Sequence, residues 1–422
     1  MSNPFLQLDP ASRRHFMLKT AKTALGVSVL SHFDMLEAAS EPAARKGKAK
    51  AVIALYMGGG MTHIDTWDPK TGETKGYKDP ISTNATGIQL GGYMTQMAKH
   101  ADKISIIRSM SSKTGAHEQG NYLMHTGYDP RGTIIHPTLG SWAQYHLGKS
   151  HKTLPASVTI GTGNTNPGFF PPALAPIPIS NPDGGLQNAK STVDNATFRE
   201  RISLMGELDS GFRKKFDVAP VKAYSEFYDQ TMQLLTSTDL EAFDLTKETD
   251  ATKKLYGTGF GKSCMLARRL VQHGVRYVEV QSGGWDMHGD VDGAMGRTGT
   301  GMDAGFAALL EDLQKTGLLA TTMVVMFSEF GRTPNINENR GRDHYPKVFS
   351  TVFAGGGVKG GFVYGASDKD GKEPIDKQVT PQDFIATVGA GLGLPIEKVV
   401  LSPSGRPFTV GDKGKAVSEI FA

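Results

Sequence analysis

The chain has 422 residues, enough for one large α/β domain or two smaller ones. Its 38% hydrophobic and 21% charged residues are typical of a water-soluble globular protein and exclude a disordered or membrane-embedded one. The net charge of +4 is spread along the chain, so we expect no nucleic-acid partner. A single cysteine, Cys264, excludes an internal disulfide, and its apolar helical surroundings predict a buried structural thiol.

The N-terminus has the order of features found in an export signal. Arg13 and Arg14 precede Phe16, as in a twin-arginine signal. The weakly apolar stretch at 20–33 is shorter than the roughly 20 apolar residues that span a bilayer, and small residues at 38–44 offer cleavage sites. We therefore predict that residues 1–45 are a signal and linker read by the twin-arginine translocase. The mature protein would be periplasmic or secreted, attached to a membrane only through an uncleaved signal. An amphipathic helix with a chance arginine pair is the alternative.

Residues 46–422 are predicted to form one domain in which strands and helices alternate. Apolar runs bounded by glycine predict buried strands at 51–57, 104–108, 275–280, 322–327 and 348–354, with a shorter candidate at 157–160 inside an irregular stretch from 153 to 195. Helical patterns cover 197–245, 262–273 and 303–316, and another helix is expected to start at Thr380. This alternation predicts a mostly parallel central sheet covered on both faces, which is a three-layer α/β/α sandwich.

Histidines and carboxylates follow three of these strands, and others lie in one later loop. In open α/β sheets, ligands bind at the carboxyl ends of strands. The residues are His63, Asp65, Asp286, His288, Glu329, Asp343 and His344. Each short motif alone is more often a turn with a satisfied histidine. Their coincidence at strand ends predicts a metal site, and imidazole with carboxylate suits zinc, manganese or iron.

Several blocks of sequence resemble a known family. They are GGGMTHIDTWDPK, HPTLGSW, GGWDMH, VMFSEFGRTPNIN, GRDHYP and FAGGGVKGGFVYGASD. They resemble an exported family of unknown function, DUF1501, which is itself similar to the sulfatases of the alkaline-phosphatase superfamily. The resemblance runs from about residue 51 to 411. It implies an alkaline-phosphatase-like fold with a divalent metal, zinc, manganese or calcium, at the carboxyl ends of the central strands.

The resemblance also implies roles for the strand-end residues. Asp65, with His63 nearby, resembles the acidic ligand after the first strand, Asp286 and His288 the mid-chain pair, Glu329 the strand-end acid, and Asp343 and His344 the late ligands. Two features depart from the family pattern. Glu329 stands where relatives usually carry aspartate, and the spacing of Asp286 and His288 is tighter than the common form.

The catalytic residues are less clear, because the Cys/Ser-x-Pro-x-Arg motif of sulfatases is absent. The candidate hydroxyls follow Arg108 and are Ser109, Ser111, Ser112 and Thr114. A serine-rich turn is the plain alternative. His117 is a candidate ligand, base or helix cap. Arg332 and Arg342 are candidates for holding a tetrahedral anion through bidentate contacts, with a surface salt bridge as the alternative.

The sequence therefore predicts an exported metal-dependent hydrolase of phosphate or sulfate esters. Its substrate would be a small-molecule or polysaccharide ester. The missing nucleophile motif and the unusual acid Glu329 motivate a different reading. In that reading the protein is a catalytically degenerate, sulfatase-like binding or assembly protein of the cell envelope.

Overall fold

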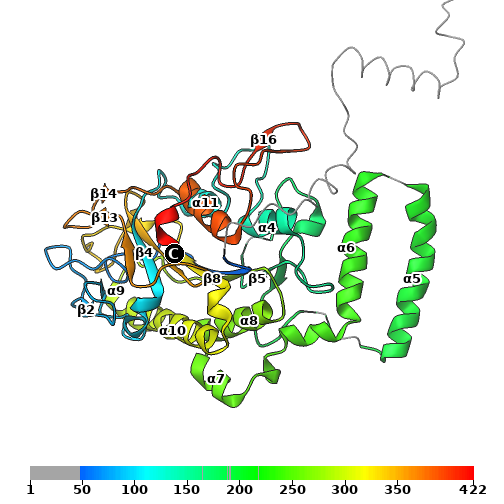
Figure 1. Ribbon diagram of the computed structural model, residues 1–422, viewed down its shortest axis with the longest axis horizontal. Helices are drawn as coiled ribbons and strands as arrows, with labels where there is room; N and C mark the ends of the chain where they lie inside the picture. Colours follow the sequence, from blue (N-terminus) through cyan, green and yellow to red (C-terminus); the bar gives the residue numbers. More distant parts are fainter. Residues whose placement is uncertain (1–47, 164, 188, 190–191, 217) are drawn as a thin grey trace, which may run out of the picture. The chain divides into compact units, whose positions relative to one another are not determined.

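The computed structural model describes residues 48–163, 165–187, 189, 192–216 and 218–422 (Figure 1). The predicted signal and linker at 1–45 lie outside the described residues. Within the described part of the chain, no helix is long and apolar enough to cross a membrane.

An eight-stranded sheet forms the centre of the domain. In spatial order its strands are β12 (Phe362–Tyr364), β4 (Ile104–Met110), β11 (Phe349–Ala354), β8 (Thr322–Phe327), β1 (Ala51–Met57), β7 (Tyr277–Ser282), β5 (Ser157–Ile160) and β6 (Ile177–Ile179). In this sheet β11 is antiparallel to both of its neighbours, and the other pairings are parallel. The prediction of a mostly parallel sheet is therefore confirmed.

Helices cover both faces of the sheet. The side chains of β1, which point alternately to the two faces, show which helices cover each one. The side chains of Ile53 and Leu55 join the core under α8 (Phe260–Gln272) and α10 (Thr300–Lys315). Val52 and Ala54 join the core under α3 (His117–Thr126), α4 (Leu139–Leu147) and α11 (Pro381–Leu392). Successive side chains of a strand point to opposite faces, so a strand with two apolar faces needs cover on both. The helices are α3 (His117–Thr126), α4 (Leu139–Leu147), α5 (Asn195–Lys215), α6 (Ala219–Leu235), α7 (Asp250–Tyr256), α8 (Phe260–Gln272), α9 (Val291–Ala294), α10 (Thr300–Lys315) and α11 (Pro381–Leu392). The predicted three-layer α/β/α sandwich is confirmed.

The predicted elements agree closely with the structure where their sequence signal is strong. The strands predicted at 51–57 and 322–327 have the bounds of β1 and β8. Thr380 caps α11 as predicted: its hydroxyl accepts from the Asp383 amide at 3.2 Å, and the Asp383 carboxylate accepts from the Thr380 amide at 3.0 Å. The strands β6 and β12 were not predicted, because three residues are too few to show a period.

A buried histidine on the α3 side of the sheet makes stability depend on pH. The His136 ring stacks on Tyr128 with centroids 4.3 Å apart. The Tyr122 hydroxyl accepts from the His136 amide at 2.7 Å and lies 2.6 Å from Nδ1, so it donates to a neutral ring. Burial, aided by Arg131, lowers the pKa of His136 from 6.5 to about 4.

Stability is therefore expected to fall as the pH drops from about 6.5 to 4. In that window His136 is protonated in the unfolded chain but stays neutral in the folded protein. This difference lowers the unfolding free energy by on the order of 3 kcal/mol at pH 4. His136→Phe keeps an aromatic ring in the stack and removes the titrating group. Urea denaturation between pH 7 and 4 should show a shallower loss of unfolding free energy in this variant. The same slope in both proteins would contradict the assignment.

Candidate metal centre

The candidate site lies where three neighbouring strands of the sheet end. The strands β8, β1 and β7 are adjacent and parallel, so their carboxyl ends meet at one edge of the sheet. β1 runs into the turn at 58–60, β7 into the loop at 283–288, and β8 into the segment at 328–332. The short strand β10 (His344–Tyr345) pairs with β9 (Gly331–Arg332) and brings a later loop to the same place.

Three imidazoles converge there on one carboxylate oxygen. Asp286 Oδ1 lies 3.0 Å from Nε2 of His288, 3.1 Å from Nε2 of His344 and 3.3 Å from Nε2 of His117. The Nε2 atoms of His288 and His344 are 3.0 Å apart. We call these four residues, His117, Asp286, His288 and His344, the His/Asp cluster.

Each histidine of the cluster is anchored through its other ring nitrogen. Nδ1 lies 2.7 Å from Glu329 Oε1 in His117, 3.0 Å from Asp343 Oδ1 in His288, and 2.7 Å from the carbonyl oxygen of Gly115 in His344. An Nδ1 that donates to an oxygen leaves the lone pair of a neutral ring on Nε2. In that tautomer the Nε2 lone pairs are on the Asp286 side of each ring, and the Nε2 atoms of His288 and His344, 3.0 Å apart, need a proton or a cation between them.

The spacing of the cluster fits a transition-metal ion. Metal–ligand bonds of about 2.1 Å place neighbouring ligand atoms about 3.0–3.4 Å apart in octahedral or tetrahedral geometry. The separations from Asp286 Oδ1, between 3.0 and 3.3 Å, match this range. The ligand atoms of His117, Asp286 and His344 all lie within 4.8 Å of one another, and His288 joins this group through Asp286 and His344. Imidazole nitrogens with a carboxylate oxygen suit zinc, manganese or iron. Calcium, one of the metals that the family resemblance implied, takes oxygen ligands and does not suit three imidazoles.

The carboxylate at the centre of the cluster is held in its charged form. Burial alone would favour the neutral acid, but the hydrogen bond and the charge of Arg332 lower the pKa of Asp286 well below its usual range. Its side chain is 48% exposed. It opens onto a cleft of about 620 Å³ whose lining includes Tyr56, Glu118, Asn121 and Tyr122. A molecule from solvent can therefore reach the cluster.

Arg332 has a different position from the predicted anion clamp or surface salt bridge. Its side chain is fully buried. Nε donates to the carbonyl of Gly60 at 2.9 Å, Nη1 donates to the carbonyl of Arg342 at 3.0 Å, and Nη2 contacts both Gly59 and Asp286. The guanidinium joins the strand-end loops to one another, and none of its three nitrogens faces an open substrate site.

The first two predicted metal ligands, Asp65 and His63, lie outside the cluster. Asp65 is buried and pairs with Arg342 at 2.8 Å, while Thr62 donates its hydroxyl to the same carboxylate at 2.8 Å. The ring of His63 is bonded to the carbonyl of Gly371 at 2.9 Å. Both side chains have protein partners of their own, and neither is bonded to the His/Asp cluster in the described part of the chain. Arg342, likewise fully buried, is occupied by Asp65 and by backbone carbonyls.

Among the predicted catalytic groups, His117 reaches the cluster. It is the first residue of α3, and its ring lies between Glu329 and Asp286. The Thr114 hydroxyl accepts from the Ala116 amide at 3.2 Å, and the Ser111 amide donates to the carbonyl of Val379 at 2.9 Å. In the described part of the chain, neither hydroxyl is bonded to the cluster.

Glu329 and Asp343, both predicted ligands, lie outside the His/Asp cluster, each beside one of its histidines. Each contacts the Nδ1 of a cluster histidine instead of entering the centre. Asp343 also accepts from the side-chain amide of Asn337 at 3.0 Å. The sequence showed these acids to be near the site but gave no signal that distinguishes a ligand from its support.

The fold and the cluster together define an α/β/α protein with a histidine-rich centre at its strand ends. Residues 49–421 match the family described as "Protein of unknown function (DUF1501)", and the chain belongs to that family. No curated protein matches the sequence.

Several solved structures are similar in fold. Ps i-CgsB in complex with k-i-k-neocarrahexaose is 12% identical, with a TM-score of 0.41 over 83% of this chain and 73% of that one. The sulfatase PsFucS1 from Pseudoalteromonas sp. is 12% identical, with a TM-score of 0.38 over 91% and 76%. The lipoteichoic acid synthase LtaP from Listeria monocytogenes is 11% identical, with a TM-score of 0.36 over 90% and 79%. At TM-scores below 0.5, these likenesses do not assign a role to any residue of this chain.

Arg332→Met is expected to destabilise the fold, because it leaves Asp286 and several buried carbonyls without their donor. The loss should be about 2–4 kcal/mol in unfolding free energy, because three carbonyl oxygens lose a charged donor, while the half-exposed Asp286 can turn to water. Arg340→Met is the matched control, since the Arg340 side chain is 64% exposed. Chemical denaturation of both variants checks this, and equal stabilities would show that Arg332 does not join the loops as described.

Proposed function

We propose that the protein is a metal-dependent hydrolase of phosphate or sulfate esters that works in the cell envelope. The observation that carries this proposal is the convergence of three anchored Nε2 atoms on Asp286 Oδ1 beside an open cleft. A metal ion held there would polarise an ester oxygen and offset the charge that develops on it. The protein's part is to fix the histidines through Nδ1 and to keep Asp286 ionised through Arg332.

The surroundings of the cluster affect how an anionic ester would bind. Among the described residues that line the cleft there is no lysine or arginine, and Glu118 adds a negative charge. Arg332 is occupied by backbone and Asp286. Attraction of a phosphate or sulfate group would therefore depend on the metal ion. Since no hydroxyl of the Ser111–Thr114 loop is bonded to the cluster in the described chain, we infer that water attacks the ester directly.

A catalytically degenerate binding protein is the second candidate. It is favoured by the missing nucleophile motif and by the same lack of a bonded hydroxyl. Such a protein would bind a metal and a ligand in the cleft without turnover. The two candidates share the metal centre and differ in their chemistry, so activity separates them.

The first test measures metal content and activity in the wild type and in His288→Ala. The purified protein should hold a transition metal in stoichiometric amount after reloading with zinc or manganese. His288→Ala removes one converging nitrogen and should lower metal affinity and turnover of aryl phosphates, phosphodiesters or sulfates at least tenfold.

The matched control is His151→Ala, because His151 lies outside the cluster, 4.0 Å from Asp239. It should retain metal and turnover. A wild-type protein that binds no transition metal would overturn the metal-dependent mechanism. Stoichiometric metal without turnover of any ester class would favour the binding protein.

We also propose that the protein is exported through the twin-arginine pathway, as the motif at Arg13 and Arg14 indicates. That pathway carries folded proteins, which suits a chain that acquires its metal before crossing. Arg13→Lys combined with Arg14→Lys should leave the protein in the cytoplasm and its fold unchanged. Cell fractionation, with mass spectrometry of the mature N-terminus, measures this. Equal periplasmic recovery of both forms would exclude the signal, and a mature start between about residues 40 and 50 would support cleavage there.

A further inference from the structure

We infer that Glu329 is a positioning residue that orients His117 toward the metal, and that it is not itself a metal ligand. The inference rests on the proposed metal site. It differs from the role that the family resemblance implied for the strand-end acid. The contacts of the Glu329 carboxylate carry it.

The Glu329 carboxylate is buried and held by three donors. Oε1 accepts from the Gly59 amide at 2.8 Å and from His117 Nδ1 at 2.7 Å, which fills both of its lone-pair sites. Oε2 accepts from the Tyr56 hydroxyl at 2.9 Å. The Ser328 hydroxyl lies 3.0 Å from Oε2, but its single proton is directed to the Met57 carbonyl at 2.6 Å. The side chain is also 2% exposed, so solvent does not compete for it.

Tyr56 holds the far side of this carboxylate in place. Its hydroxyl accepts from the Asn121 side-chain amide at 2.9 Å, which leaves its own proton for Glu329. Burial, followed by the charge of Glu329, raises the pKa of Tyr56 far above its ordinary value, so the hydroxyl always donates. Tyr56 lies in β1 and Glu329 directly follows β8, its neighbour in the sheet. The hydrogen bond therefore ties the orientation of His117 to the two central strands.

The consequence for the metal is indirect and measurable. A carboxylate that accepts from Nδ1 fixes the ring tautomer and makes Nε2 a better ligand, and loss of such a partner typically weakens metal binding 10–100-fold. Glu329→Gln has nearly the same shape but no negative charge. If its NH2 group faces His117 Nδ1, a donor meets a donor. If its oxygen faces Nδ1, the hydrogen bond remains but loses its charged acceptor. In both orientations the anchor of His117 is weakened.

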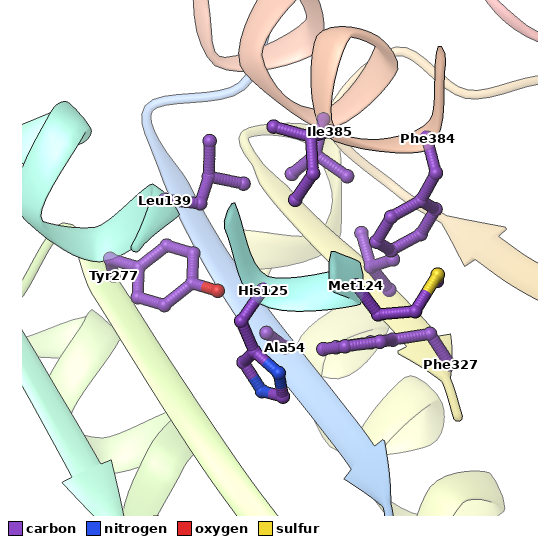
Figure 2. A pocket seen from close by; sticks show the side chains of 10 residues that line it. Ala54, Met124, His125, Leu139, Tyr277, Phe327, Phe384 and Ile385 are labelled. Atoms are coloured by element: carbon purple, nitrogen blue, oxygen red, sulfur yellow. The ribbon is translucent and has the colours of Figure 1, made fainter. Parts of the chain in front are cut away.

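A second buried carboxylate provides the control. Glu279 is 4% exposed and lies 3.2 Å from Nε2 of His125, so it is also a buried glutamate paired with a histidine. Figure 2 shows His125 in its pocket, near Tyr277 and the apolar side chains of Ala54 and Phe327. Neither Glu279 nor His125 belongs to the His/Asp cluster. Glu279→Gln therefore makes the same chemical change in a similar setting without touching a ligand.

The experiment titrates zinc against a competing chelator and records the visible spectrum of the cobalt-loaded protein. It compares the wild type, Glu329→Gln, Tyr56→Phe and Glu279→Gln. Glu329→Gln should bind zinc 10–100-fold more weakly, with unchanged stoichiometry and an unchanged cobalt coordination spectrum. Tyr56→Phe should shift affinity in the same direction by a smaller factor. Glu279→Gln should match the wild type.

The outcomes separate this inference from the proposed function. If the wild type binds neither zinc nor cobalt, the proposed metal site itself is ruled out. A wild type that binds zinc while Glu329→Gln binds it equally well overturns the positioning role alone. A cobalt spectrum of altered coordination number in Glu329→Gln would make Glu329 a ligand and also overturn it. Thermal melting establishes folding, and if Glu329→Gln does not fold, unchanged zinc affinity in Tyr56→Phe decides against the inference.

Discussion

The arrangement of the site depends on one buried guanidinium. Arg332 lies in β9, a short distance along the chain from the end of β8. Its hydrogen bonds reach the turn after β1 through Gly59 and Gly60, the loop after β7 through Asp286, and the later loop through the carbonyl of Arg342. Parallel strands bring their ends to one edge of a sheet but do not fix the loops that leave them. A planar group with five donors does so, because each donor direction selects one loop position.

Around that guanidinium the site is built in two layers. The inner layer is the set of Nε2 atoms and the Asp286 oxygen, and the outer layer is the set of oxygens on Nδ1, from Glu329, Asp343 and the Gly115 carbonyl. The inner groups are partly open to solvent. In the outer layer Glu329 is buried, whereas the Asp343 side chain is 55% exposed. His117 is thus oriented by a buried support, and the centre remains reachable from the cleft.

The sequence revealed the sheet and the neighbourhood of the site, but not the division of roles within it. Long apolar runs such as 51–57 predict strands because burial on both faces leaves little room for polar residues. Asp286, His288 and His344 could be expected at the site because each lies at a strand end or in the loop that follows. Asp65 was expected there as well, because its partner Arg342 is 277 positions away along the chain and no local motif signals the pair. The supporting role of Glu329 depends on which donors lie within 3 Å of its oxygens, and no motif spacing encodes that.

The position of β1 has a consequence for how the chain is made. β1 is the first strand of the sheet along the sequence, yet it lies between β7 and β8, which begin at Tyr277 and Thr322. At a synthesis rate of about 5–20 residues per second, its apolar residues emerge roughly 10–40 s before either neighbour exists. During that interval a strand that is buried on both faces in the folded protein has no native partner. Pairings of such long sequence separation also form slowly. The apolar strand β1 therefore stays exposed until residues 277–327 have been made, and the centre of the sheet forms late in synthesis.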